Sequence, residues 1–238
     1  MLDPIRQHLA DAMAAIEGKG PAPTREQAAV LLEQARALDP PKVQPRKVDI
    51  GIPERFAAAD LETWAATTPG QQRVAAVVRR FAANFDGAKS LGSSLVFRGG
   101  VGTGKTTLAC ATLRAVHAAG YSARYTTLAH FFRRMKESFG GDGPAASAIQ
   151  AQFARVSLLV IDEVGVQYGS KAELVMLTEL IDERYAAKRP TIVVSNLGAA
   201  QLIDMVGERA ADRLAEQGVD LLFDWPSFRR RRGQDGAQ

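Results

Sequence analysis

Residues 99 to 106 limit the fold of this chain more than any other stretch. They read GGVGTGKT, which has the spacing G-x-x-x-x-G-K-[ST]. The stretch follows a short apolar run, Leu95 to Phe97, and opens a helical pattern that extends from Thr106 to Ala118. Glycines let backbone N–H groups turn inward around an anion, and the N-terminus of a helix adds positive potential. The stretch therefore predicts a phosphate-binding loop between a buried strand and a helix.

The side chains of this loop indicate a nucleoside triphosphate, with ATP and Mg²⁺ as the expected cofactors. In this motif a lysine reaches the β- and γ-phosphates and a hydroxyl group binds magnesium, and Lys105 and Thr106 stand at these positions. A chance glycine-rich turn is the alternative, but the strand, the lysine and the helix are all in register. The residues expected to contact the nucleotide are Gly99, Gly100, Val101, Gly102, Thr103, Gly104, Lys105, Thr106 and Thr107.

Two adjacent carboxylates, Asp162 and Glu163, follow the apolar run LLVI. Ligands of a parallel sheet bind at the carboxyl ends of its strands. We therefore expect Asp162 to hold Mg²⁺, directly or through water, and Glu163 to activate an attacking water. An ordinary loop start is the alternative. The pair favours ATP hydrolysis over transfer of the phosphoryl group to a second substrate, because the sequence suggests neither an acceptor pocket nor lid arginines.

Strand and helix patterns alternate from residue 51 onward, which predicts an α/β fold. Strands are expected at 95–97, 123–127, 158–162, 191–195 and 221–223, and the longest helical pattern covers 172–188. Such alternation gives a mostly parallel sheet with helices on both faces. The strand 191–195 could lie between the two motif-bearing strands, so Asn196 could reach the attacking water and the γ-phosphate. An asparagine that merely ends a strand is the alternative.

The N-terminal region has a different pattern. Two short helices are expected within 1–38, and residues 39–47 contain three prolines and three basic residues. Such short helices bury little apolar surface by themselves, so they need a partner, either the main domain or another protein. We divide the chain into a helical partner-docking segment (1–38), a linker (39–50) and an ATPase domain (51–238).

Composition narrows the setting further. Cys110 is the single cysteine and can form no internal disulfide, and no apolar run approaches the roughly 20 residues of a membrane span. We therefore expect a cytoplasmic protein without a membrane partner. The net charge of +4 is matched by the four arginines at 229–232, so bulk charge gives little support for nucleic-acid binding.

Taken in order, the motifs resemble the DnaC-type replicative helicase loaders of the AAA+ class. The resemblance covers roughly residues 51 to 231. It is carried by GIPERFAAADLETW, the glycine-rich loop, LLVIDEVGVQ, KRPTIVVSN, GERAADR and FDWPSFR. The GVQ after Asp162 and Glu163, and the spacing between GER and DR, separate the chain from the related IstB-type transposition helpers.

This resemblance implies subunits that assemble with ATP at each junction. Arg209 and Arg213 would act on the ATP of a neighbouring subunit, and residues four apart lie on one face of a helix. A solvated helix with a pair between Arg209 and Asp212 is the alternative. Arg230 would contact the γ-phosphate in its own chain, while the surrounding arginines could be a solvated tail.

The resemblance also implies contact with single-stranded DNA. Family positions that line a single-strand channel match Phe139 and Ser170, and Lys171 and Lys136 supply nearby cations. The chain departs from the family at Ala172, where an aromatic residue is usual. Phe139 as a core residue of its helix is the alternative.

The function implied is ATP-dependent loading of the hexameric replicative helicase onto single-stranded DNA during replication. The N-terminal helices would dock on the helicase, and the ATPase domains would self-associate through ATP and hydrolyse it slowly. Two alternatives remain: an IstB-type transposition helper, and an adaptor that binds ATP and DNA without hydrolysis.

Overall fold

The structure is a computed structural model that describes residues 49–138, 144–165 and 170–228. The chain divides into two units between Lys47 and Val48, and the first unit lies outside the described residues. The helical segment 1–38, most of the linker, Phe139 and Arg230 therefore lie outside it as well. The domain boundaries stay predictions.

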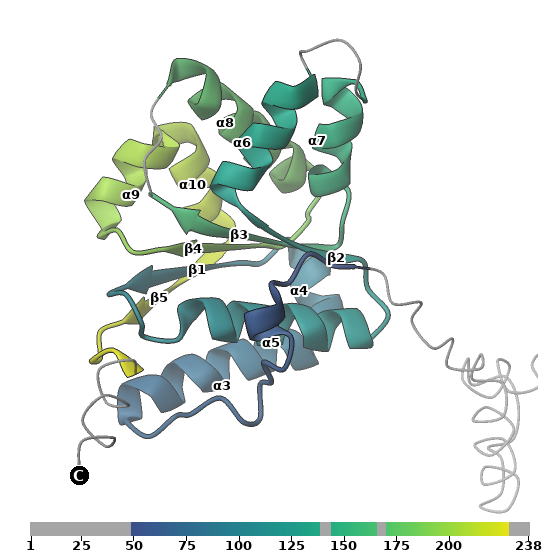
Figure 1. Ribbon diagram of the computed structural model, residues 1–238. Helices are drawn as coiled ribbons and strands as arrows, with labels where there is room; N and C mark the ends of the chain where they lie inside the picture. Colours follow the sequence, from purple (N-terminus) through teal and green to yellow (C-terminus); the bar gives the residue numbers. More distant parts are fainter. Residues whose placement is uncertain (1–48, 139–143, 166–169, 229–238) are drawn as a thin grey trace, which may run out of the picture. The chain divides into compact units, whose positions relative to one another are not determined.

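The described residues build a parallel sheet of five strands in the order β2-β3-β4-β1-β5 (Figure 1). The strands are β1 (Ser94–Gly99), β2 (Ala123–Thr127), β3 (Leu158–Val164), β4 (Thr191–Ser195) and β5 (Gly218–Phe223). The helices are α3 (Pro69–Ala83), α4 (Phe85–Leu91), α5 (Lys105–Ala118), α6 (Leu128–Glu137), α7 (Ala146–Ala154), α8 (Lys171–Ala186), α9 (Ala199–Val206) and α10 (Glu208–Gln217). A short 3-10 helix, Glu54–Phe56, precedes α3.

Helices cover both faces of the sheet, so the predicted α/β fold is confirmed. Figure 1 shows α3, α4 and α5 on one face and α6 to α10 on the other. The core is correspondingly split in two: Leu95 and Phe97 of β1 belong to the cluster on the α5 side, and Val96 between them belongs to the opposite cluster. This is the alternation that a strand buried on both faces requires.

The five strands predicted from sequence are all present, and β4 lies between β1 and β3 as expected. Two short helices, α4 and α9, were missed because seven or eight residues give little periodicity. The apolar spacing of Val74, Val77, Val78, Phe81 and Phe85 predicts one helix through Phe85. Instead α3 ends at Ala83, and Asn84 follows it with ψ of 48°. α4 begins at the next residue.

A buried arginine fixes the beginnings of two central strands. Arg184 of α8 donates hydrogen bonds to the carbonyl oxygens of Phe153, Ala154, Val156 and Pro190. Burial lowers the pKa of this guanidinium, and the carbonyl acceptors replace the water it loses. Because these carbonyls precede β3 and β4, Arg184 helps set the position of the strands whose far ends carry predicted site residues.

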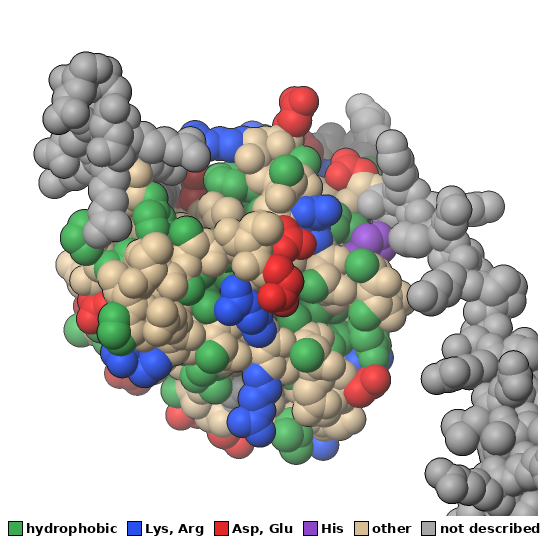
Figure 2. All heavy atoms as spheres, turned by 90° about the horizontal axis from the view of Figure 1, so that it is seen from below, with side chains coloured by type: hydrophobic (Ala, Val, Ile, Leu, Met, Phe, Trp, Pro, Cys, Tyr) green, Lys and Arg blue, Asp and Glu red, His purple; other side chains and the backbone are tan. Residues whose placement is uncertain are grey.

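The surface over α3 carries mixed charge. Figure 2 shows this face from below, with Lys and Arg side chains beside Asp and Glu side chains rather than in one broad basic patch. That agrees with a nearly neutral body outside the arginine-rich tail. No helix in the described part of the chain is long and apolar enough to cross a membrane.

Candidate nucleotide-binding site

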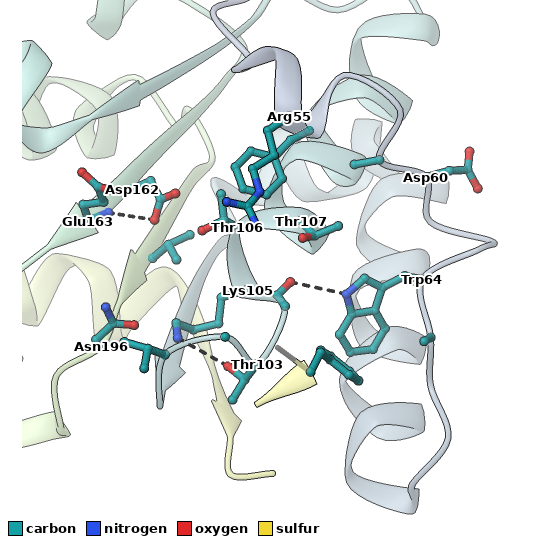
Figure 3. A pocket seen from close by; sticks show the side chains of 18 of the residues that line it. Arg55, Asp60, Trp64, Thr103, Lys105, Thr106, Thr107, Asp162, Glu163 and Asn196 are labelled. Carbon is teal, nitrogen blue, oxygen red and sulfur yellow. Dashed lines mark hydrogen bonds between the residues drawn. The ribbon is translucent and has the colours of Figure 1, made fainter. Parts of the chain in front are cut away.

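A pocket of about 820 Å³ opens at the carboxyl ends of β1, β3 and β4. Its walls bring together three predicted motifs: loop residues 101–107, the pair Asp162 and Glu163, and Asn196 (Figure 3). A fourth wall comes from residues 55–65, part of what we call the pre-α3 segment (residues 49–68). The strand order brings the motifs together, since three adjacent parallel strands end at one edge.

The glycine-rich loop leads directly into the N-terminus of α5. Gly104 precedes the helix with φ of 90°, and a Cβ atom there would lie 3.0 Å from both Phe228 and Trp64. A side chain at this position would therefore be strained and crowded. The N–H groups of the first turn are left for an anion, which is the geometry of a phosphate site.

Lys105 lies inside the curve of this loop. Its ammonium donates to the carbonyl oxygens of Gly99 and Gly100, at 2.8 and 2.7 Å, and the residue is only 5% exposed. Thr103 also donates to Gly100, at 2.8 Å. Thr106 and Thr107, the next residues, line the pocket (Figure 3). The loop therefore presents a cation and hydroxyl groups where phosphates would bind.

Aromatic residues brace the outer side of the loop. The indole N–H groups of Trp64 and Trp225 donate to Gly104 and Thr103, at 3.3 and 3.0 Å. The backbone N–H of Phe228 donates to Gly102 at 2.9 Å. Sequence reasoning missed this role, although both tryptophans of the chain lie in the motifs that carried the resemblance.

A β-bulge separates the two acidic side chains. Between Ile161 and Val164, β3 has one residue more than the paired stretch of β4. Within it Glu163 has φ of 59°, a left-handed conformation that costs on the order of 1 kcal/mol in a non-glycine residue. Asp162 is 4% exposed, whereas Glu163 is exposed at the pocket wall. The bulge gives adjacent carboxylates different environments, as their two predicted roles require.

Both carboxylate oxygens of Asp162 accept hydrogen bonds from the chain. The N–H of Glu163 donates to Oδ1 at 2.7 Å, and the hydroxyl of Tyr125 donates to Oδ2 at 2.8 Å. Burial raises the pKa of Tyr125, and the charge of Asp162 raises it further, so the phenol stays protonated and acts as the donor. Sequence reasoning missed Tyr125, which has no motif around it.

The oxygen donors at this edge suit magnesium. Asp162 and Thr106 line the same pocket and supply a carboxylate and a hydroxyl, and Mg²⁺ in nucleotide sites typically takes one or two carboxylates plus phosphate and water oxygens. Among the described residues no group of three or more His, Cys, Asp or Glu could hold a metal. Asp162 and Thr106 therefore fit a cation whose other ligands would be phosphate and water oxygens.

Asn196 follows β4 and is exposed in the pocket wall (Figure 3). The residue before it, Ser195, donates its hydroxyl to the carbonyl oxygen of Val164 at 2.5 Å and so ties the end of β4 to the bulge. The expected position of Asn196 between the loop and the acidic pair agrees with this geometry.

Arg209 and Arg213 are not among the described residues that line the pocket. Both contact Asp182 of α8, at 2.7 and 3.7 Å, and the Arg213 guanidinium lies 4.3 Å from the centre of the Tyr185 ring. The partner of Arg209 is thus Asp182 rather than Asp212. The Arg209 side chain remains 70% exposed. Arg209 and Arg213 therefore lie together on the outer surface of α10, next to Asp182.

Of the residues expected to contact DNA, Ser170 has a structural role. Its hydroxyl accepts from the N–H of Glu173 at 3.2 Å and caps α8. Lys171 is exposed beside it, and Lys136 donates to Glu173 at 2.7 Å. Burial raises the pKa of Glu173, but hydrogen bonds from Lys136 and Ser170 outweigh it and lower the pKa overall. DNA contact by Phe139, Ser170 and Lys171 stays a prediction.

Comparison with known proteins identifies the family. The family described as IstB-like ATP binding protein matches residues 88–231. The chain is also 32% identical over 182 residues to the replicative helicase loader DnaC of Escherichia coli strain K12, covering 76% of this chain and 73% of the relative. The chain belongs to the DnaC/IstB-like family.

Solved structures agree with this assignment. The crystal structure of the DnaC helicase loader matches with a TM-score of 0.65 and 25% identity, over 71% of this chain and 99% of that one. The replication initiator DnaA bound to AMPPCP and single-stranded DNA matches with a TM-score of 0.64 and 21% identity, over 78% and 55%. The second likeness shows the fold alone. The expected AAA+ fold and resemblance to DnaC-type loaders are confirmed, and the family is one that binds ATP.

The thiol of Cys110 is buried in this DnaC/IstB-like protein, so we expect it to react slowly. Burial of Cys110 within α5 and the nearby Asp162 raise its pKa to about 12. Only the thiolate reacts, so at pH 8 we expect the native protein to react with a disulfide reagent about 10³-fold more slowly than denatured protein. The reaction rate of the native protein should still be rising with pH above pH 9, because the raised pKa keeps most of the Cys110 thiol protonated there. Absorbance of the released thiol measures it, with Cys110→Ser as the blank. Equal rates in native and denatured protein would contradict the burial.

Proposed function

We propose that this protein is an ATP-dependent loader of the replicative DNA helicase and acts as an oligomeric nucleotide switch. One observation carries the proposal. Lys105, Asp162 and Glu163 line the pocket expected to bind ATP, whereas the arginines of α10 are not among the described residues that line it. Relatives named as replicative helicase loaders support the biological role.

Within one subunit the residues have complementary tasks. The loop binds the phosphates through its N–H groups and Lys105, and Thr106 with Asp162 would hold Mg²⁺, which neutralises phosphate charge when bound. Glu163 accepts the proton of the attacking water, and Asn196 orients that water. Arg230 is proposed to contact the γ-phosphate from the same chain. ATP is hydrolysed to ADP and phosphate, slowly and under the control of partners.

The arginines of α10 would complete the site of a neighbouring subunit. Asp182 holds Arg209 and Arg213 together through salt bridges to both. An arginine supplied across a junction can accelerate hydrolysis by about 10³ to 10⁵. ATP at the junction would then link self-association to turnover, which is how the protein could time engagement and release of its partners.

The partners follow from the same proposal. Residues 1–38 would dock on the hexameric helicase, and single-stranded DNA would contact Phe139, Ser170 and Lys171. The site would work in the cytoplasm, where the replication machinery of a bacterium acts. A transposition helper of IstB type remains the second candidate, because the matching family carries that name.

Mixing two inactive variants tests the shared site. We expect Arg209→Ala/Arg213→Ala and Lys105→Ala to be inactive alone and to regain ATP turnover when mixed. In a random equal mixture, about a quarter of the junctions take the lysine from the arginine variant and the arginines from the lysine variant. Phosphate release measures turnover.

The control mixture combines Lys105→Ala with the double variant Lys105→Ala/Glu163→Gln. Neither chain has the lysine, so no junction can be complete. Arg155→Ala, which removes an exposed arginine outside the pocket, checks for loss of a surface charge alone. Mixtures that stay inactive, although the arginine variant still binds ATP and Lys105→Ala is folded, would contradict a role across the junction.

Co-purification tests the partner. We expect the full-length protein to retain the replicative helicase and a chain of residues 48–238 to lose it, because the proposed docking segment is then missing. Equal binding of fluorescent ATP by both chains is the control for the ATPase domain. Retention of helicase by the shorter chain would remove the docking role from residues 1–38, and retention of a transposase instead would favour the second candidate.

A further inference from the structure

Tyr125 connects the edge of the sheet to the acidic end of β3. It lies on β2, is 7% exposed, and pairs in register with Val160 of β3. Its hydroxyl reaches past that register position to Asp162, at 2.8 Å. The phenol is therefore directed along the strand toward the pocket, while its ring fills the core beside α5.

This hydrogen bond restricts the carboxylate more than burial alone would. With Oδ1 accepting from the Glu163 N–H and Oδ2 from Tyr125, rotation of the Asp162 carboxyl group would break one bond or both. Each carboxylate oxygen has a further lone pair for a cation or its bound water. Second partners of this kind orient a metal-binding carboxylate.

The backbone of Tyr125 is bonded in turn to the pre-α3 segment. Its N–H donates to the carbonyl oxygen of Ile50 at 2.7 Å. Gly51 has φ of 79°, and a Cβ there would lie 2.6 Å from the Tyr125 carbonyl oxygen. Asp49 accepts from the Gly51 N–H at 2.8 Å and closes the turn. Residues 49–51 thus contact the same residue whose side chain holds Asp162.

We propose that Tyr125 is a positioning residue that aims Asp162 at magnesium, and that residues 49–51 influence the metal site through it. The proposal rests on the assignment of Asp162 to Mg²⁺ in the proposed function. It adds a route by which the chain immediately after the N-terminal segment alters nucleotide binding. The test of this route measures coupling between the two positions.

The readout is the magnesium gain, defined as the Kd of a fluorescent ATP analogue in EDTA divided by its Kd in Mg²⁺. We expect Tyr125→Phe to lower this gain by about 10-fold, in line with other losses of a second partner, while the Kd in EDTA stays within about 2-fold. Tyr121→Phe is the matched control, because its hydroxyl also bonds an aspartate, Asp86, but lies outside the pocket lining.

Asp162→Asn separates the two claims. If it removes the magnesium gain and Tyr125→Phe leaves the gain at the wild-type value, the positioning role is wrong and the metal assignment stands. If Asp162→Asn also leaves the gain unchanged, the metal assignment itself fails. Thermal unfolding in EDTA confirms that each full-length variant is folded.

Gly51→Ala tests the second half of the proposal. Its added Cβ would push residues 49–51 away from Tyr125, so we expect a gain lowered by about 3-fold in the wild-type background and unchanged in the Tyr125→Phe background. Gly120→Ala is the control, since Gly120 has a similar φ of 95° with nothing within 4 Å of the added atom. An equal effect of Gly51→Ala in both backgrounds, or none in the wild type, would overturn the route through Tyr125.

Discussion

The phosphate-binding loop depends on hydrogen bonds made by its own carbonyl groups. Lys105 binds two of these carbonyls from inside the curve, and Trp64 and Trp225 bind two others from outside. A loop this rich in glycine loses much conformational entropy on folding, so bonds on both sides are needed to keep its N–H groups aimed at one point. Trp64 and Trp225 lie near opposite ends of the described part of the domain, so residues far apart in the sequence hold the loop.

The order of the strands determines which side chains lie beside the loop. Because β4 lies between β1 and β3, Asn196 and the bulge at Asp162 and Glu163 end beside the loop. The helix α10 lies on the face of the sheet opposite to α5, and both of its arginines form salt bridges with Asp182. The binding groups and the two arginines of α10 are thus presented by different parts of one subunit, which is the arrangement that repeated head-to-tail assembly can use.

Sequence reasoning succeeded where the signal is local. The loop between β1 and α5 and the five strands are contiguous patterns, and β4 lies between β1 and β3 as the sequence allowed. Tyr125, Trp225 and Asp182 could not be predicted this way, because each acts through a contact with a residue far along the chain. Ser170 is different: Ser-x-x-Glu is a readable capping signal, but family resemblance drew attention to DNA instead. Its capping bond is compatible with that proposal without supporting it.

In the proposed function, two neighbouring chains together form one complete hydrolytic site. The most direct measurement is ATP turnover per chain as a function of protein concentration, at saturating ATP and Mg²⁺. We expect turnover per chain to rise steeply with concentration and then level off as junctions fill. Turnover per chain that stays constant from the most dilute sample upward, in a protein shown to be monomeric there, would contradict it.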